Sequence, residues 1–129
     1  MLMKFLLYFA ALLFAVLGIA HSYLGERYVL SRIFRVPALP RLSGSTLYMQ
    51  RILRLAWHVT SVAWWGLASV LIMLANPPLD TRAVSAAVGI TALVSFVIVL
   101  VGSRGKHVAA WLMFLIIGAI TLYHASGRT

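Results

Sequence analysis

Cysteine is absent from this chain of 129 residues, and only two residues, Glu26 and Asp80, are acidic. Without cysteine the chain has no disulfide, no thiolate metal ligand and no cysteine nucleophile. With so few carboxylates it has no ring of acids to select cations in a channel. Metal-binding spacings such as H-E-x-x-H and E-x-x-H are also missing. Any metal or catalytic site would therefore be assembled from side chains of separate segments.

Charged residues of either sign are scarce, at 10% of the chain, whereas 63% of the residues are hydrophobic. Soluble domains have about 25% charged and about 45–50% apolar residues, so this composition indicates a membrane protein. Four apolar runs are close to the roughly 20 residues that a helix needs to cross a bilayer. We therefore predict an all-α fold, an integral membrane four-helix bundle, made by a single domain of residues 1–129. The predicted spans are about 2–24, 48–75, 83–102 and 106–124.

Basic residues outnumber acidic residues by eleven to two, and they are unevenly distributed along the chain. If the chain crosses four times, the side with both termini holds only Lys4, Arg82 and Arg128. The other eight basic residues lie in or beside the first and third connections. Because Lys and Arg collect in cytoplasmic loops, we predict a multi-pass protein of a bacterial-type inner (plasma) membrane with both termini outside the cytoplasm. Nucleic acid is not an expected partner, because there is no soluble basic fold to bind it.

The first connection has a pattern of its own. Arg27, Ser31 and Arg35 recur every four residues among apolar side chains, which places them on one face of a helix. We predict an amphipathic interfacial helix on the inner leaflet, with its arginines toward anionic lipid headgroups and its end at Pro37. The run S-G-S-T at 43–46 then supplies N-cap residues for a second long helix.

The later connections are short and contain helix breakers, N-P-P at 76–78 and G-S-R-G at 102–105. Short links join antiparallel neighbours, so the second span should pack beside the third, and the third beside the fourth. The third span also carries small residues, including Ser85 and Gly89, that let membrane helices approach closely. We expect these small residues to serve packing inside the protein.

Three of the four histidines are predicted to share one depth in the membrane. His21 lies about one turn before the inner end of the first span, and His58 about one turn after the inner end of the second. His107 lies in the first turn of the fourth span, within roughly one turn of the same level. His124 lies at the opposite face, about 25 Å from His107. Glu26 is the one carboxylate on the inner side.

Ionisable groups at membrane depth are costly and usually face one another or a cavity, so this layer is a candidate site. Imidazole and carboxylate groups suit a divalent transition metal, with His21, His58, His107 and Glu26 as ligands. Haem b would instead lie between His21 and His58, with room made by Gly18 one turn deeper. The remaining alternative is that no cofactor binds and that Glu26 simply pairs with an arginine.

The second span supplies candidates for contact with a lipid, a quinone or another ligand: Arg54, Trp57 and Trp65. Arg54, His58 and Trp65 share one face, at spacings of four and seven, and would form a pocket wall reaching inward from the histidines. Trp57 fits the aromatic belt at the membrane boundary. Trp64 and Trp65 lie near the bilayer centre, and the alternative is that they pack against small residues of the third span.

These patterns leave three hypotheses for the function and assign no catalytic residue. The first is a redox or ligand-holding membrane protein with haem or metal at the histidine layer. The second is an accessory or scaffolding subunit of a larger membrane complex, without a cofactor. The third is a lipid- or quinone-handling membrane enzyme that uses the same layer for acid–base chemistry. No Ser–His–Asp grouping is expected, because Asp80 lies on the other side of the membrane from His21 and His58.

Overall fold

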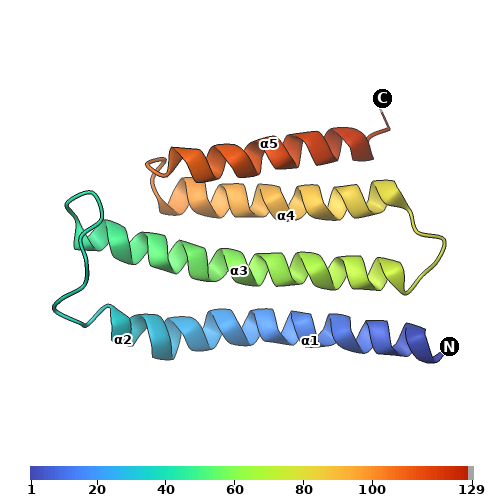
Figure 1. The fold of residues 1–129 in the computed structure, drawn as a ribbon, viewed down its shortest axis with the longest axis horizontal. Coiled ribbons are helices and arrows are strands. Elements are labelled where there is room, and N and C mark those ends of the chain that lie inside the picture. Colours follow the sequence, from blue (N-terminus) through green and yellow to red (C-terminus); the bar gives the residue numbers. More distant parts are fainter. Residues whose placement is uncertain (128–129) are drawn as a thin grey trace.

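The computed structural model describes residues 1–127 and contains four helices that are each long and apolar enough to span a membrane (Figure 1). These helices are α1 Leu2–Leu24, α3 Thr46–Leu74, α4 Thr81–Gly102 and α5 Val108–Ala125. The chain is therefore an all-α, multi-pass membrane protein with four candidate spans. Arg128, which the charge count assigned to the side with the termini, lies outside the described residues.

The first α-helix has the predicted bounds of its span, Leu2–Leu24, but the chain stays helical beyond it. It continues through a π-helical segment, η1 Gly25–Leu30, into the short α2 Ser31–Ile33, so that Leu2–Ile33 is one helix of 32 residues. The prediction of a separate interfacial helix is not confirmed, since none is identified within residues 1–127. Gly25, which could have broken the helix, keeps helical angles of φ −59° and ψ −51°. At about 1.5 Å per residue this helix is about 48 Å long and exceeds the roughly 30 Å hydrocarbon core.

Side chains at the starts of α3 and α4 explain where these helices begin. Ser45 precedes α3, and its hydroxyl oxygen accepts a hydrogen bond from the Tyr48 N–H at 3.2 Å. This confirms the predicted N-cap in the run at 43–46. Asp80 precedes α4 and accepts from the Arg82 N–H at 2.9 Å. Each cap satisfies one of the N–H groups that the first turn of a helix leaves free.

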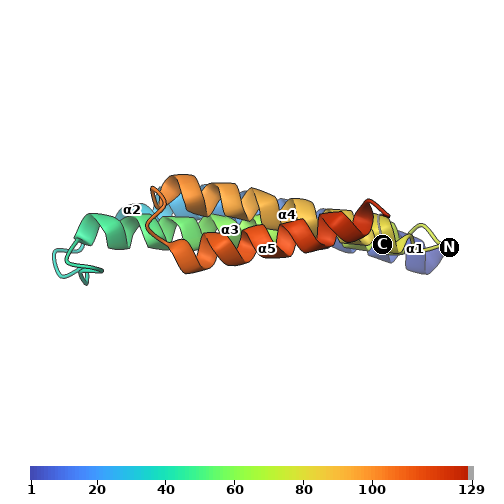
Figure 2. The ribbon, with the colours of Figure 1, turned by 90° about the horizontal axis from the view of Figure 1, so that it is seen from above.

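The four helices form an open layer and not a closed bundle. Figure 1 shows them side by side in the order α1, α3, α4 and α5, and Figure 2 shows the same layer edge-on, with α5 set to one side of α4. In the described part of the chain, α1 packs against α3, α3 against α4 and α4 against α5, but α1 packs against neither α4 nor α5. The predicted neighbours of the third span are confirmed, whereas closure between the first and last spans is absent from residues 1–127.

Glycines allow close approach at each of the three helix pairs. Added Cβ atoms on Gly18 of α1 and Gly25 of η1 would overlap the indoles of Trp65 and Trp57 on α3, and one on Gly66 of α3 would overlap Thr91 of α4. On α4, Gly89 lies against Thr121 and Leu122 of α5 in the same way. The prediction that small residues of the third span serve internal packing is confirmed at Gly89. Weakly polar, small-residue contacts of this kind hold helices together where lipid removes the hydrophobic driving force.

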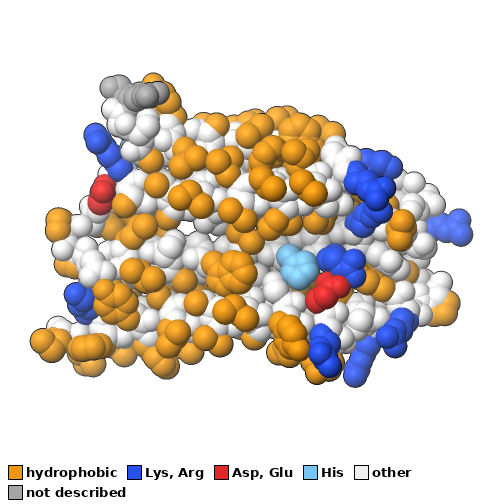
Figure 3. All heavy atoms as spheres, turned by 180° about the vertical axis from the view of Figure 1, so that it is seen from behind, with side chains coloured by type: hydrophobic (Ala, Val, Ile, Leu, Met, Phe, Trp, Pro, Cys, Tyr) orange, Lys and Arg blue, Asp and Glu red, His pale blue; other side chains and the backbone are white. Residues whose placement is uncertain are grey.

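The layer has two chemically different ends. The start of α1 and the end of α5 lie at one end together with the α3–α4 connection, and the connections before α3 and after α4 lie at the other (Figure 1). We call the second one the arginine-rich end, and Figure 3 shows the basic side chains gathered there. Its basic residues are Arg27, Arg32, Arg35, Arg41, Arg51, Arg54, Arg104 and Lys106. Apolar side chains cover most of the surface between the two ends (Figure 3).

Candidate functional site

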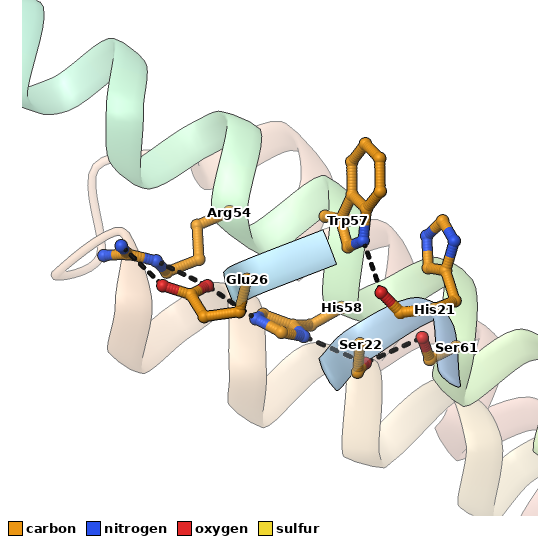
Figure 4. Close-up of polar contacts among 7 residues, drawn as sticks. All are labelled: His21, Ser22, Glu26, Arg54, Trp57, His58 and Ser61. Atoms are coloured by element: carbon orange, nitrogen blue, oxygen red, sulfur yellow. Dashed lines mark hydrogen bonds and ion pairs between the residues drawn. The ribbon is translucent and has the colours of Figure 1, made fainter. Parts of the chain in front are cut away.

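A chain of polar contacts joins α1 to α3 near the arginine-rich end (Figure 4). The Arg54 guanidinium meets the Glu26 carboxylate through two bonds, NH2 to Oε1 at 2.7 Å and Nε to Oε2 at 3.0 Å. His58 Nε2 lies 3.3 Å from the same Oε2 atom. A guanidinium that holds both oxygens of a carboxylate fixes its plane as well as its position. Glu26 is thereby oriented toward both Arg54 and His58.

The chain continues from His58 into the protein. His58 Nδ1 lies 3.0 Å from the Ser22 hydroxyl, and Ser22 donates to the Ser61 hydroxyl oxygen at 2.8 Å. Ser61 is completely buried, whereas the Arg54 and Glu26 side chains are 47% and 42% exposed. Five side chains therefore connect the surface to the α1–α3 interface. We call this set the polar cluster: Ser22, Glu26, Arg54, His58 and Ser61.

Helix geometry explains how the polar cluster forms. Ser22 and Glu26 are four residues apart on the first helix, and Arg54 and His58 are four apart on α3. Residues at this spacing project from one face, so each helix presents a polar stripe that meets the other. Sequence analysis named Glu26, Arg54 and His58 but missed both serines. The signal was available, because a polar side chain every third or fourth residue is unusual in an apolar span.

Predictions about a Ser–His–carboxylate grouping also change. Asp80 caps α4 at the end of the layer opposite His21 and His58, as expected, and Glu26 supplies a carboxylate to His58 instead. The order hydroxyl, imidazole, carboxylate is that of hydrolytic triads. However, Ser22 lies inside a helix, where backbone N–H groups bond to carbonyls one turn earlier and leave no donors for an oxyanion. The arrangement therefore suits proton transfer better than acyl transfer.

His21 belongs to a different contact set from His58. Its ring stacks on the Trp57 indole with 4.4 Å between ring centroids and 5° between planes, and it meets Trp64 edge-on at 4.7 Å. The Trp57 N–H donates to the His21 carbonyl oxygen at 2.9 Å. Figure 4 shows the His21 ring beside Trp57, turned away from His58 and Glu26. Equal depth therefore does not bring these two imidazoles together.

Trp65 packs against Gly18, the residue that was expected to make room for a haem. Its indole N–H donates to the Ala15 carbonyl oxygen at 3.2 Å. The deeper tryptophans were predicted to pack against the third span, but Trp64 and Trp65 both contact α1, and Trp65 also lines a groove with alanines of α4. The α1–α3 interface is thus filled by side chains at the level where Gly18 was expected to leave room.

The other two histidines lie apart from the polar cluster. His107 is the residue immediately before α5, and its backbone N–H donates to the Ser103 hydroxyl oxygen at 3.3 Å. Since α5 does not pack against α1 in the described residues, His107 does not join His21. His124 Nδ1 lies 2.9 Å from the Ser85 hydroxyl at the other end. Within residues 1–127 no group of three His, Cys, Asp or Glu side chains is close enough to hold a metal ion.

The ion pair between Arg54 and Glu26 and the contacts of the two indoles with glycine are of different kinds. The Arg54–Glu26 pair is almost half exposed, and pairs of this kind contribute about 0–1 kcal/mol. The indoles of Trp57 and Trp65 pack closely on Gly25 and Gly18, although Trp65 is still 43% exposed. Both the indoles and the polar cluster therefore join the first helix to α3.

Comparisons with protein-family models, with curated proteins and with solved structures find no match to this chain.

Proposed function

We propose that this protein handles an amphipathic small molecule, a lipid or a quinone, and that His58 and Glu26 exchange a proton with its polar head. The observation that carries the proposal is the continuous hydrogen-bonded chain from exposed Arg54 to buried Ser61. An imidazole held between a hydroxyl and a carboxylate accepts a proton on one nitrogen and releases one from the other. His58 is 31% exposed, so a headgroup has access to it.

A groove beside the polar cluster favours a ligand that has an apolar tail. It has a volume of about 500 Å³ and lies between α3 and α4. Its α3 wall begins at Val62, one turn beyond His58 on the same face, and continues through Trp65 and Ser69. Ligand pockets in proteins commonly measure about 300–1,000 Å³ and are mostly apolar with a few polar groups. An apolar groove that starts one turn from an imidazole fits a ligand with a polar head and a tail.

Quinone binding tests this proposal directly. The purified protein is titrated with a short-chain quinone while quenching of tryptophan fluorescence is followed, since Trp65 lines the groove. Saturable quenching is expected, with about tenfold weaker affinity in His58→Gln, because the head, which would replace Glu26 at His58 Nε2, loses one hydrogen bond. His124→Gln is the matched control and should bind like the unchanged protein. Mass spectrometry of co-purifying molecules distinguishes a lipid from a quinone. Equal affinity in both variants would contradict the role of His58.

An accessory or scaffolding subunit is the second candidate function. The open layer supports it, because only 6–22% of each candidate span is buried within the chain. Helices in a larger membrane complex would cover more of these faces. Purification after cross-linking in the native membrane tests this candidate. A partner chain recovered in fixed ratio supports it, and recovery of the chain alone speaks against it.

The haem or metal hypothesis stays a prediction, and the arrangement of the histidines does not favour it. His21 stacks on Trp57, His58 contacts Ser22 and Glu26, and His107 lies on the far helix. An absorbance spectrum and a metal analysis of one purified sample test it. A Soret band that disappears in His21→Ala and in His58→Ala would restore haem, and metal without a Soret band would restore the ion.

The orientation in the membrane is also part of the proposal. The imbalance of basic residues supports placing the arginine-rich end in the cytoplasm of a bacterial-type inner membrane. Arg27 and Arg32, on the extension of the first helix, would then meet anionic headgroups of the inner leaflet. Reporter fusions at the two termini and in the connection before α3 test this. A reporter that is active in the cytoplasm only when fused to a terminus would reverse the assignment.

A further inference from the structure

Three basic side chains line a hollow at the arginine-rich end, and none of them belongs to the polar cluster. The hollow has a volume of about 360 Å³ and lies between the start of α3 and the α4–α5 connection. Its basic residues are Arg51, Arg104 and Lys106. Tyr48 and Ser43 add hydroxyl groups beside them. In contrast to the groove beside His58, this hollow is mostly polar, and its charge is of one sign.

No carboxylate within residues 1–127 pairs with these three cations. The two acidic residues of the chain are engaged elsewhere, since Glu26 holds Arg54 and His58, and Asp80 caps α4 at the other end. Three neighbouring positive charges repel one another unless an anion lies among them. The charge of the hollow therefore calls for a negatively charged ligand from outside the chain.

An apolar groove adjoins the hollow and runs along the membrane span. Its first part has a volume of about 300 Å³ and is lined by α3, α4 and α5 side chains, including Ile52, Leu55 and Phe114. Ile52 and Leu55 lie one turn beyond Tyr48 and Arg51 on α3. A second part of about 540 Å³ continues it, and Phe114 belongs to both parts. The cationic hollow is thus the mouth of a long apolar groove between α3 and α5.

The length of the first part of the groove along α3 is close to the thickness of one leaflet of a bilayer. Half of a roughly 30 Å hydrocarbon core is about 15 Å, which corresponds to about ten residues of helix. Ten residues from Arg51 lead to Ser61, and the first part of the groove ends at Val59 on this helix. An acyl chain that starts at the hollow would therefore lie along the first part of the groove and reach the second.

We propose that this site binds one anionic phospholipid, with its phosphate among Arg51, Arg104 and Lys106 and an acyl chain in the groove between α3 and α5. Guanidinium and ammonium groups are the side chains that bind phosphate in proteins. Charge and apolar length together exclude a free anion, which has no tail, and a neutral lipid, which has no net charge. This site is independent of the proposed function, because it shares no residue with the polar cluster.

Native mass spectrometry of the purified protein tests the proposal, after incubation with phosphatidylglycerol or phosphatidylcholine that carry identical acyl chains. One phosphatidylglycerol per chain is expected to remain bound, with phosphatidylcholine retained far less. The triple variant Arg51→Gln/Arg104→Gln/Lys106→Gln should bind phosphatidylglycerol about a hundredfold more weakly, since each basic residue contributes about fivefold. The triple variant Arg32→Gln/Arg35→Gln/Arg41→Gln removes the same charge at the same end and should keep the affinity.

Further variants distinguish the contribution of the headgroup to binding from that of the acyl chain, and they control for misfolding. Ala56→Trp fills the first part of the groove and should weaken phosphatidylglycerol binding while the three cations remain. If the triple variant does not fold, the three single Gln variants replace it, with their helicity checked by circular dichroism. Each of them should weaken phosphatidylglycerol binding about fivefold. Four results would overturn the proposal: equal retention of both lipids, equal loss in the control triple variant, full competition by inorganic phosphate without lipid, or a dimer whose second copy fills the groove.

Discussion

Replacing Gly18 with alanine should loosen α1 from α3. The added Cβ would lie 2.8 Å from Cδ1 and 3.0 Å from Cε2 of the Trp65 indole, and closer still to Nε1. Because helical backbone holds Gly18 in place, the indole must move and its bond to the Ala15 carbonyl oxygen is lost. Overpacking costs about 1–3 kcal/mol. The lost hydrogen bond adds about 0.6 kcal/mol in a membrane protein. We expect a destabilisation of about 2 kcal/mol, or about 30-fold in the unfolding equilibrium.

Unfolding by SDS in mixed micelles, followed by circular dichroism, measures this loss. A double variant supplies the control, because Trp65→Leu removes the ring that the new methyl group meets. Gly18→Ala should therefore cost no more than about 0.5 kcal/mol in the Trp65→Leu background. Two results would contradict the contact between Gly18 and the indole. One is a double variant that loses as much stability as Gly18→Ala and Trp65→Leu lose together, and the other is no loss in Gly18→Ala alone.

Three further predictions concern single contacts. Ser45→Ala should destabilise the protein by about 1 kcal/mol in the same unfolding assay, because α3 loses its N-cap, and Ser43→Ala should have a smaller effect. Glu26→Gln should cost less than about 1 kcal/mol, because the pair with Arg54 is half exposed, and a loss above 2 kcal/mol would show a stronger role. Trp57→Phe keeps an aromatic ring beside His21 but removes the N–H donor. It should lower stability by about 0.6 kcal/mol, and no loss would contradict the bond to the His21 carbonyl.

Much of the helix content follows from the sequence by short-range reasoning. The start of α3 at Thr46 follows from the capping serine before it, and the break after Leu74 coincides with N-P-P at 76–78. These signals act within a few residues, so no knowledge of neighbours is needed. The α-helix α1 ends at Leu24, as predicted for the first span, but Gly25 stays helical against Trp57 and the helix continues to Ile33. Contact with another helix decided that outcome.

The candidate site was predictable only in part. Depth follows from counting residues along a helix, and of the predicted group of His21, His58, His107 and Glu26 the structure brings His58 and Glu26 together. The depth of a residue does not tell which way its side chain points. Successive side chains are rotated by about 100° around the helix axis, and only the packing of the helices shows which of them face a neighbouring helix. His21 therefore faces Trp57 instead of His58, and Ser22 takes its place.

The sequence by itself determined that the chain has four apolar helices, where most of them begin and end, and that its basic residues gather at one end, because composition, caps and breakers act locally. Only the tertiary structure decided that the helices form an open layer and which side chains meet between them. Those features depend on which faces of distant segments pack together, as Gly18 with Trp65 and Ser22 with His58 do, and no local pattern encodes that choice.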